Sequence, residues 1–114
     1  MILGIGCDIV SIERFKNILN KTPAFLKRVY SENEIREYNL RNNSISYLAS
    51  RFAAKEAIVK SLTEYNHSLN TIEILNSSKG EPIVKIQNMD NVNIKLSLSY
   101  EKEYVIAYAI LLSI

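Results

Sequence analysis

The sequence lacks the features of disulfide-bonded, secreted and membrane-spanning proteins. Its one cysteine, Cys7, has no partner within the chain, which excludes an internal disulfide and suits a reducing compartment. The longest apolar stretch, residues 104–112, is far shorter than the roughly 20 residues that a membrane-spanning helix requires. The N-terminal residues lack the succession of a basic segment, an apolar block and a cleavage site that is typical of a secretion signal. We therefore expect a cytoplasmic protein without a membrane segment.

The sequence also has only a small excess of positive over negative charge. The formal net charge of +2 does not indicate nucleic-acid binding by itself. The seven tyrosines are scattered, without the basic residues between them that a nucleic-acid stacking platform needs. Residues 11–41 are mildly basic and have two interpretations, the solvated face of helices or a docking surface for an acidic protein.

The length and the apolar content indicate one globular domain. Apolar residues make up 47% of the 114 residues, enough for one core but too few residues for two domains. We expect a single domain over residues 1–114. Because a domain of this size has too few residues around its core to enclose a deep pocket, a neighbouring subunit is expected to complete a catalytic site.

The first half of the chain predicts one strand followed by helices. Residues 2–10 alternate between an apolar side, with Cys7 as a small core side chain, and a side that carries two glycines and Asp8. These glycines allow another backbone or a ligand to approach Asp8 closely. Serines in cap positions and apolar residues three and four apart predict helices. The expected helices cover residues 12–20, 24–29, a stretch from 32, and 45 to about 64.

The longest predicted helix carries a core stripe that includes Leu48 and Leu62, with Arg51 and Lys55 set aside from it. Short β-rich runs follow at residues 71–75, 82–86, 93–99 and 103–112, separated by turn residues. They predict an antiparallel meander. Because the helices precede these strands, the expected class is α+β, with the long helix packed on the sheet.

Three side chains are candidates for chemistry. Glu56 and Lys60 are four residues apart on one face of the long predicted helix, and Asp8 follows the apolar part of the first strand. Two carboxylates, together with waters and substrate phosphates, suffice to bind Mg²⁺. The alternatives are a helix-stabilising Glu56–Lys60 ion pair worth about 0.2–0.5 kcal/mol, and Asp8 as a helix cap.

Two segments carry a resemblance to a known family. They are Gly4-Ile5-Gly6-Cys7-Asp8-Ile9-Val10 and Arg51-Phe52-Ala53-Ala54-Lys55-Glu56-Ala57-Ile58-Val59-Lys60. In this order and at this separation they resemble the two signature segments of the holo-acyl-carrier-protein synthases, the short 4′-phosphopantetheinyl transferases of bacteria. A looser resemblance covers Gly80-Glu81-Pro82 and residues 96–104, so that it extends over the whole chain.

This resemblance implies an enzyme of fatty acid biosynthesis. Such an enzyme transfers 4′-phosphopantetheine from coenzyme A to a serine of apo acyl carrier protein and releases adenosine 3′,5′-bisphosphate. By their matching positions, Asp8 and Glu56 bind Mg²⁺, and Lys60 contacts the pyrophosphate. A divalent ion and a cation stabilise the charge that builds on the phosphate oxygens. The base is either Glu56 or a water on the metal that Asp8 holds.

The resemblance also implies where substrates and subunits bind. Arg51 would bind the adenosine 3′-phosphate of coenzyme A. Arg14 and Arg28 would dock the acidic helix of the carrier protein, and Phe25 is either an apolar contact beside them or a core residue. The family forms homotrimers with active sites between subunits.

Two positions depart from the family pattern. Tyr100 stands where the family usually has a histidine that contacts coenzyme A, and residues 63–66 replace a glycine-rich loop. Because the metal and leaving-group residues are present, we expect an active enzyme. The alternative is an impaired member of the family that only binds coenzyme A or carrier protein; a nucleic-acid-binding protein is a third interpretation.

Overall fold

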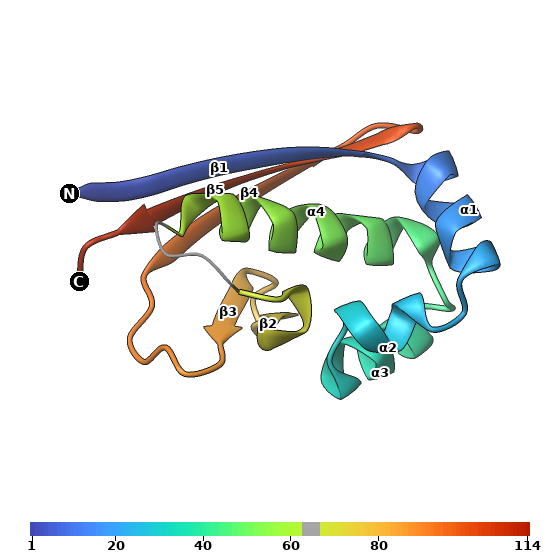
Figure 1. Ribbon diagram of the computed structural model, residues 1–114, viewed down its shortest axis with the longest axis horizontal. Helices are drawn as coiled ribbons and strands as arrows, with labels where there is room; N and C mark the ends of the chain where they lie inside the picture. The colour runs from blue at the N-terminus through green and yellow to red at the C-terminus, as the bar shows by residue number, and fades with distance from the viewer. Residues whose placement is uncertain (63–66) are drawn as a thin grey trace.

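The computed structural model describes residues 1–62 and 67–114 of the chain. The elements follow in the order β1 (Ile2–Ser11), α1 (Ile12–Lys21), α2 (Phe25–Val29), α3 (Glu32–Leu40), α4 (Ile45–Ser61), the 3₁₀ turn η1 (Leu69–Thr71), β2 (Ile72–Asn76), β3 (Pro82–Ile86), β4 (Ile94–Tyr100) and β5 (Tyr104–Leu112). Figure 1 shows α4 running along the strands β1, β5 and β4. The predicted α+β class is confirmed.

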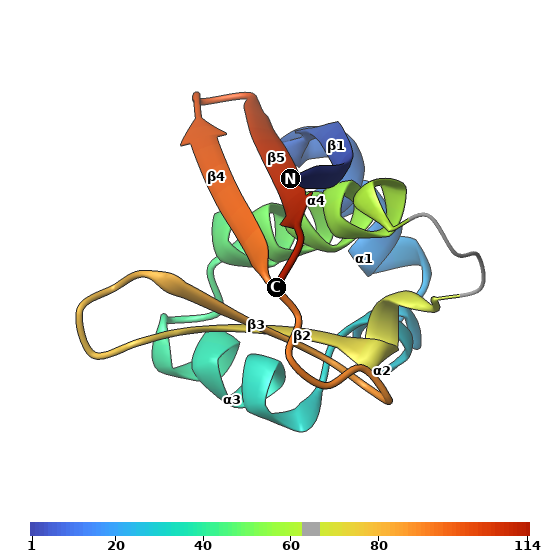
Figure 2. The same cartoon turned by 90° about the vertical axis from the view of Figure 1, so that its left-hand side faces the viewer.

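Helix α4 is the middle layer of the molecule. An antiparallel sheet in the order β1-β5-β4 covers one side of it. The hairpin β2–β3 and the helix α3 lie on its other side (Figure 2). In the part of the chain that the structure describes, no helix is both long and apolar enough to cross a membrane.

The predicted meander of four consecutive strands is wrong. Among the strands of the described residues, β2 and β3 pair with each other, whereas β4 and β5 join β1 in a separate sheet. Alternating apolar residues predict that a segment is a strand, but they do not say which strand lies beside it. The long-range pairing of β1 with β5 therefore escaped the sequence pattern.

The glycine side of β1 faces α4. A Cβ atom on Gly4 would lie 1.8 Å from the backbone oxygen of Ser61, and one on Gly6 would lie 2.0 Å from that of Ala57. The sequence predicted that either another backbone or a ligand approaches this side of β1. The structure shows the backbone of α4 there, at a distance that only glycine permits. The alternation was predicted correctly but the core side was not, because Cys7 lies on the exposed side of the sheet and is not a core residue.

The helix caps agree with the sequence prediction. Ser11 accepts a hydrogen bond from the backbone of Arg14, and Ser31 and Glu34 form the expected capping box. Helix α4 ends at Ser61, so its predicted extension to about residue 64 reaches beyond the helix and into residues 63–66, outside the described part of the chain.

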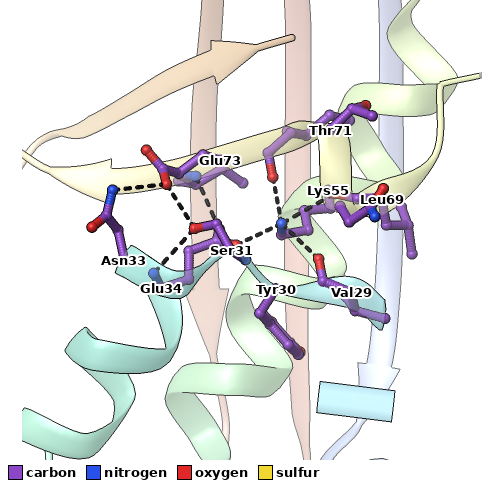
Figure 3. A network of polar contacts seen from close by, with 12 residues as sticks. Val29, Tyr30, Ser31, Asn33, Glu34, Lys55, Leu69, Thr71 and Glu73 are labelled. Atoms are coloured by element: carbon purple, nitrogen blue, oxygen red, sulfur yellow. Dashed lines mark hydrogen bonds and ion pairs between the residues drawn. The ribbon is translucent and has the colours of Figure 1, made fainter. Parts of the chain in front are cut away.

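Contrary to the prediction that set both residues aside from the core, Arg51 is buried and so is Lys55. Its Nζ lies 2.7 Å from Oε1 of Glu34, and neither side chain is exposed. The same Nζ donates to the backbone oxygen of Val29 at 2.9 Å (Figure 3). It also donates to the backbone oxygen of Ile72. Oε2 of Glu34 accepts from the backbone of Ile74 at 3.0 Å. This buried network joins α4 to α3, to the end of α2 and to the β2–β3 hairpin.

Candidate active site

Asp8 and Lys60 meet where β1 crosses α4. The Lys60 ammonium donates to Oδ1 of Asp8 at 3.3 Å and to the backbone oxygen of Cys7 at 2.9 Å. The contact depends on Gly6, because a Cβ atom there would lie 2.9 Å from Cβ of Lys60. The glycine two residues before the acid therefore allows the cation and the carboxylate to come together.

Glu56 lies on α4 beside the same pair. Burial and the nearby Asp8 carboxylate raise the pKa of Glu56, and the Lys60 ammonium opposes this shift. Among the ion pairs of the described residues, none joins Glu56 to Lys60. The N-cap of α1 is Ser11 rather than Asp8. Neither alternative interpretation of these residues accounts for the arrangement.

Asp8 and Glu56 line one pocket of about 290 Å³, together with Arg14, Phe15 and Phe52. Two carboxylates that repel each other favour a cation between them. In the described ranges 1–62 and 67–114, no cluster of three or more histidine, cysteine or acidic side chains could hold a metal. A pair of carboxylates in an open pocket suits Mg²⁺, which keeps several waters and also binds substrate phosphates. The donor set therefore fits the metal that the sequence predicted.

Arg51 and Tyr100 lie in a different pocket, of about 430 Å³, which Arg41, Tyr47 and Asn76 also line. Nη2 of Arg51 donates to Oδ1 of Asn76 at 3.0 Å. The structure thus brings together Asp8, Glu56 and Lys60, and separately Arg51 and Tyr100. It does not place both sets in one cavity of a single chain.

Sequence reasoning missed Arg41, Tyr47 and Asn76 as residues of this second pocket. Tyr47 is four residues before Arg51 and thus on the same helix face, a spacing that could have found it. Arg41 follows α3, and Asn76 lies at the end of β2, 25 residues after Arg51. No sequence pattern links these positions, because only the packing of the hairpin against α4 brings them together.

The three residues expected to dock the carrier protein lie on α1 and α2. Arg14 and Arg28 are exposed, and Phe25 is half-buried. The ring of Phe25 packs against Phe15 and Phe52, with ring centroids 5.8 and 5.7 Å apart. Phe25 therefore has a packing role, while part of its surface stays open beside the two arginines.

Comparison with known proteins gives consistent matches over nearly the whole chain. Residues 4–109 match the model of the 4′-phosphopantetheinyl transferase superfamily. The holo-[acyl-carrier-protein] synthase of Clostridium tetani is 42% identical, with 97% of this chain and 96% of the relative covered. That of Thermodesulfovibrio yellowstonii is also 42% identical, with 97% and 99% covered.

Two solved structures show the same fold. The holo-[acyl-carrier-protein] synthase of Neisseria meningitidis superposes with a TM-score of 0.88 at 30% identity, covering 99% of this chain and 100% of that one. A holo-(acyl-carrier-protein) synthase of Bacillus anthracis in complex with CoA (3′,5′-ADP) gives a TM-score of 0.80 at 33% identity, covering 97% and 96%.

Proposed function

Because the chain belongs to the holo-[acyl-carrier-protein] synthases of the 4′-phosphopantetheinyl transferase superfamily, we propose that its two pockets together form a Mg²⁺-dependent transferase site. The enzyme transfers phosphopantetheine from coenzyme A to apo acyl carrier protein. The observation that carries the proposal is the pair of carboxylates, Asp8 and Glu56, in one pocket beside the Lys60 ammonium.

Asp8 and Glu56 are the residues that would hold Mg²⁺. The ion, when bound, supplies positive charge to the pyrophosphate oxygens of coenzyme A. Lys60 adds a second positive charge for the departing adenosine 3′,5′-bisphosphate. We assign the proton of the carrier serine to Glu56, because its carboxylate lines the same pocket as Asp8. Arg14, Arg28 and the open edge of Phe25 then orient the acidic carrier beside this pocket.

A homotrimer would explain the exposed apolar face of the main sheet. Ile5, Ile9 and Tyr108 are 69%, 60% and 59% exposed on the side away from α4. The strand register places Ile106 directly opposite Ile9 and Tyr108 opposite Cys7, so the apolar side chains are continuous. A patch of this kind marks an interaction surface. We assign it to contact between copies of the chain in the cytoplasm.

Contact between copies would also complete the active site. In one chain, the Arg51 pocket and the Asp8–Glu56 pocket are separate. In a closed ring, the first pocket of one subunit can face the second pocket of its neighbour. Coenzyme A would then bind across the boundary, with its 3′-phosphate at Arg51 and Tyr100 and its pyrophosphate near Asp8.

Mixing two impaired variants tests this shared site. Asp8→Asn and Arg51→Met, co-expressed in equal amounts, are expected to give about a quarter of the wild-type sites, because each site then draws its two pockets independently. Transfer is measured at a coenzyme A concentration well below KM. Asp8→Asn mixed with Glu56→Gln is the matched control and should give no recovery, since both residues line one pocket of one subunit. An Asp8→Asn and Arg51→Met mixture no more active than its separate components would contradict the shared site.

A further inference from the structure

Two residues that line the pocket of Arg51 each have a buried polar atom without a partner. Among the described residues, the hydroxyl of Tyr47 and Nε of Arg51 are the buried side-chain atoms that make no hydrogen bond. Tyr47 is 6% exposed and Arg51 is 4% exposed. An unpaired buried donor is costly, so each such atom in a native structure calls for an explanation. Both side chains line the same pocket, which points to a ligand as the missing partner.

Two guanidinium groups gather around the Tyr47 ring in this pocket. The guanidinium carbon of Arg51 lies 4.7 Å from the ring centroid, and that of Arg41 lies 4.9 Å from it. Glu37 pairs with Arg41 at 3.0 Å, but none of the described residues that line the pocket is acidic. The pocket therefore has an excess of positive charge and of hydrogen-bond donors. A phosphate monoester, with its several acceptor oxygens, matches these donors.

We propose that the Tyr47 hydroxyl donates a hydrogen bond to the 3′-phosphate monoester of coenzyme A. Through this contact the enzyme selects coenzyme A over an analogue that lacks the 3′-phosphate. The inference rests on the proposed assignment of Arg51 to the 3′-phosphate. Burial raises the pKa of Tyr47 more than the neighbouring Arg51 guanidinium lowers it, so the phenol keeps its proton at neutral pH and acts as a donor. A donor with a free 3′-hydroxyl would leave Tyr47 and Arg51 unpaired, and a site built to hydrogen-bond a group rejects analogues that lack it.

The test is the substitution Tyr47→Phe, which removes only the hydroxyl. The preference for coenzyme A over 3′-dephospho-coenzyme A, as the ratio of kcat/KM values, is expected to fall about 10-fold or more, through KM rather than kcat. The free variant should melt about 4 °C higher, because it no longer buries an unpaired hydroxyl. Adenosine 3′,5′-bisphosphate should raise the melting temperature of the variant less than that of the wild type.

Tyr30→Phe is the matched control, because the Tyr30 hydroxyl is buried but donates to the backbone oxygen of Leu48 at 2.7 Å. This variant should lose stability and keep the donor preference. Arg51→Met distinguishes the role of Tyr47 from the assignment of Arg51 to the 3′-phosphate. If Arg51→Met loses the preference and Tyr47→Phe keeps it, the role of Tyr47 is wrong and the assignment of Arg51 stands. If neither variant changes the preference, the assignment of Arg51 to the 3′-phosphate is wrong as well.

Discussion

Replacing Glu56 with glutamine is expected to reduce kcat/KM for phosphopantetheine transfer by at least about 100-fold. Glutamine keeps the size of the side chain but removes one of the two carboxylates that line the pocket with Arg14. It also removes the group to which we assign the proton of the carrier serine. The measurement is the rate at which apo acyl carrier protein gains mass, followed by mass spectrometry at saturating Mg²⁺.

Unfolding would not explain this loss. The pKa of Glu56 is raised in the folded protein, so the folded chain binds this proton more readily than the unfolded chain does. The contribution of Glu56 to the free energy of unfolding is therefore present at low pH. It is lost as the pH rises through the pKa that Glu56 has in the folded protein. Above the folded pKa, the ionised side chain therefore lowers the stability of the fold, and glutamine removes this cost. Glu32→Gln, at an exposed position of α3, is the control and should keep the wild-type rate. A Glu56→Gln enzyme within a few fold of the wild type would refute the site.

Removing either partner of the buried Lys55–Glu34 pair is expected to cost about 3–5 kcal/mol of unfolding free energy. In Lys55→Met, the Glu34 carboxylate stays buried without its cation, and the backbone oxygens of Val29 and Leu69 lose a donor. Because small domains are stable by only about 5–15 kcal/mol, this loss is a large fraction of the total. Urea unfolding, followed by circular dichroism at fixed protein concentration, measures it.

Two further variants show whether the buried charge is the cause. The double variant Glu34→Leu with Lys55→Met removes both charges, and we expect it to be more stable than either single variant. Lys60→Met removes the lysine five residues later, whose side chain is 54% exposed, and should cost no more than about 1 kcal/mol. Equal losses at Lys55 and Lys60 would show that the buried pair has no special role.

The sequence predicted elements that depend on neighbouring residues. The caps at Ser11 and Ser31 involve residues three positions apart, and the apolar spacing in α4 repeats within a single helix. The two carboxylates of the candidate metal pocket and the lysine beside it were predicted for a different reason. The chemistry of Mg²⁺ requires carboxylates, and the signature segments supplied Asp8, Glu56 and Lys60 in a specific order.

The burial of Lys55 and the core side of β1 depend on tertiary packing and were not predicted. A lysine is rarely buried without a partner, and the partner of Lys55 is 21 residues away in a helix whose capping box already accounts for Glu34. The same limit applies to Cys7. Alternation gives two sides of a strand, and only the close approach of α4 to Gly4 and Gly6 shows which side is the core.

The most direct test of the central claim is an intact-mass assay of apo acyl carrier protein with coenzyme A, with and without a chelator. If Asp8 and Glu56 hold a divalent ion, the carrier gains about 340 Da with Mg²⁺, the mass of the phosphopantetheine arm. The gain should disappear with a chelator and return with excess Mg²⁺. Transfer at an undiminished rate in the chelator, by enzyme from which metal has been removed, would contradict the account.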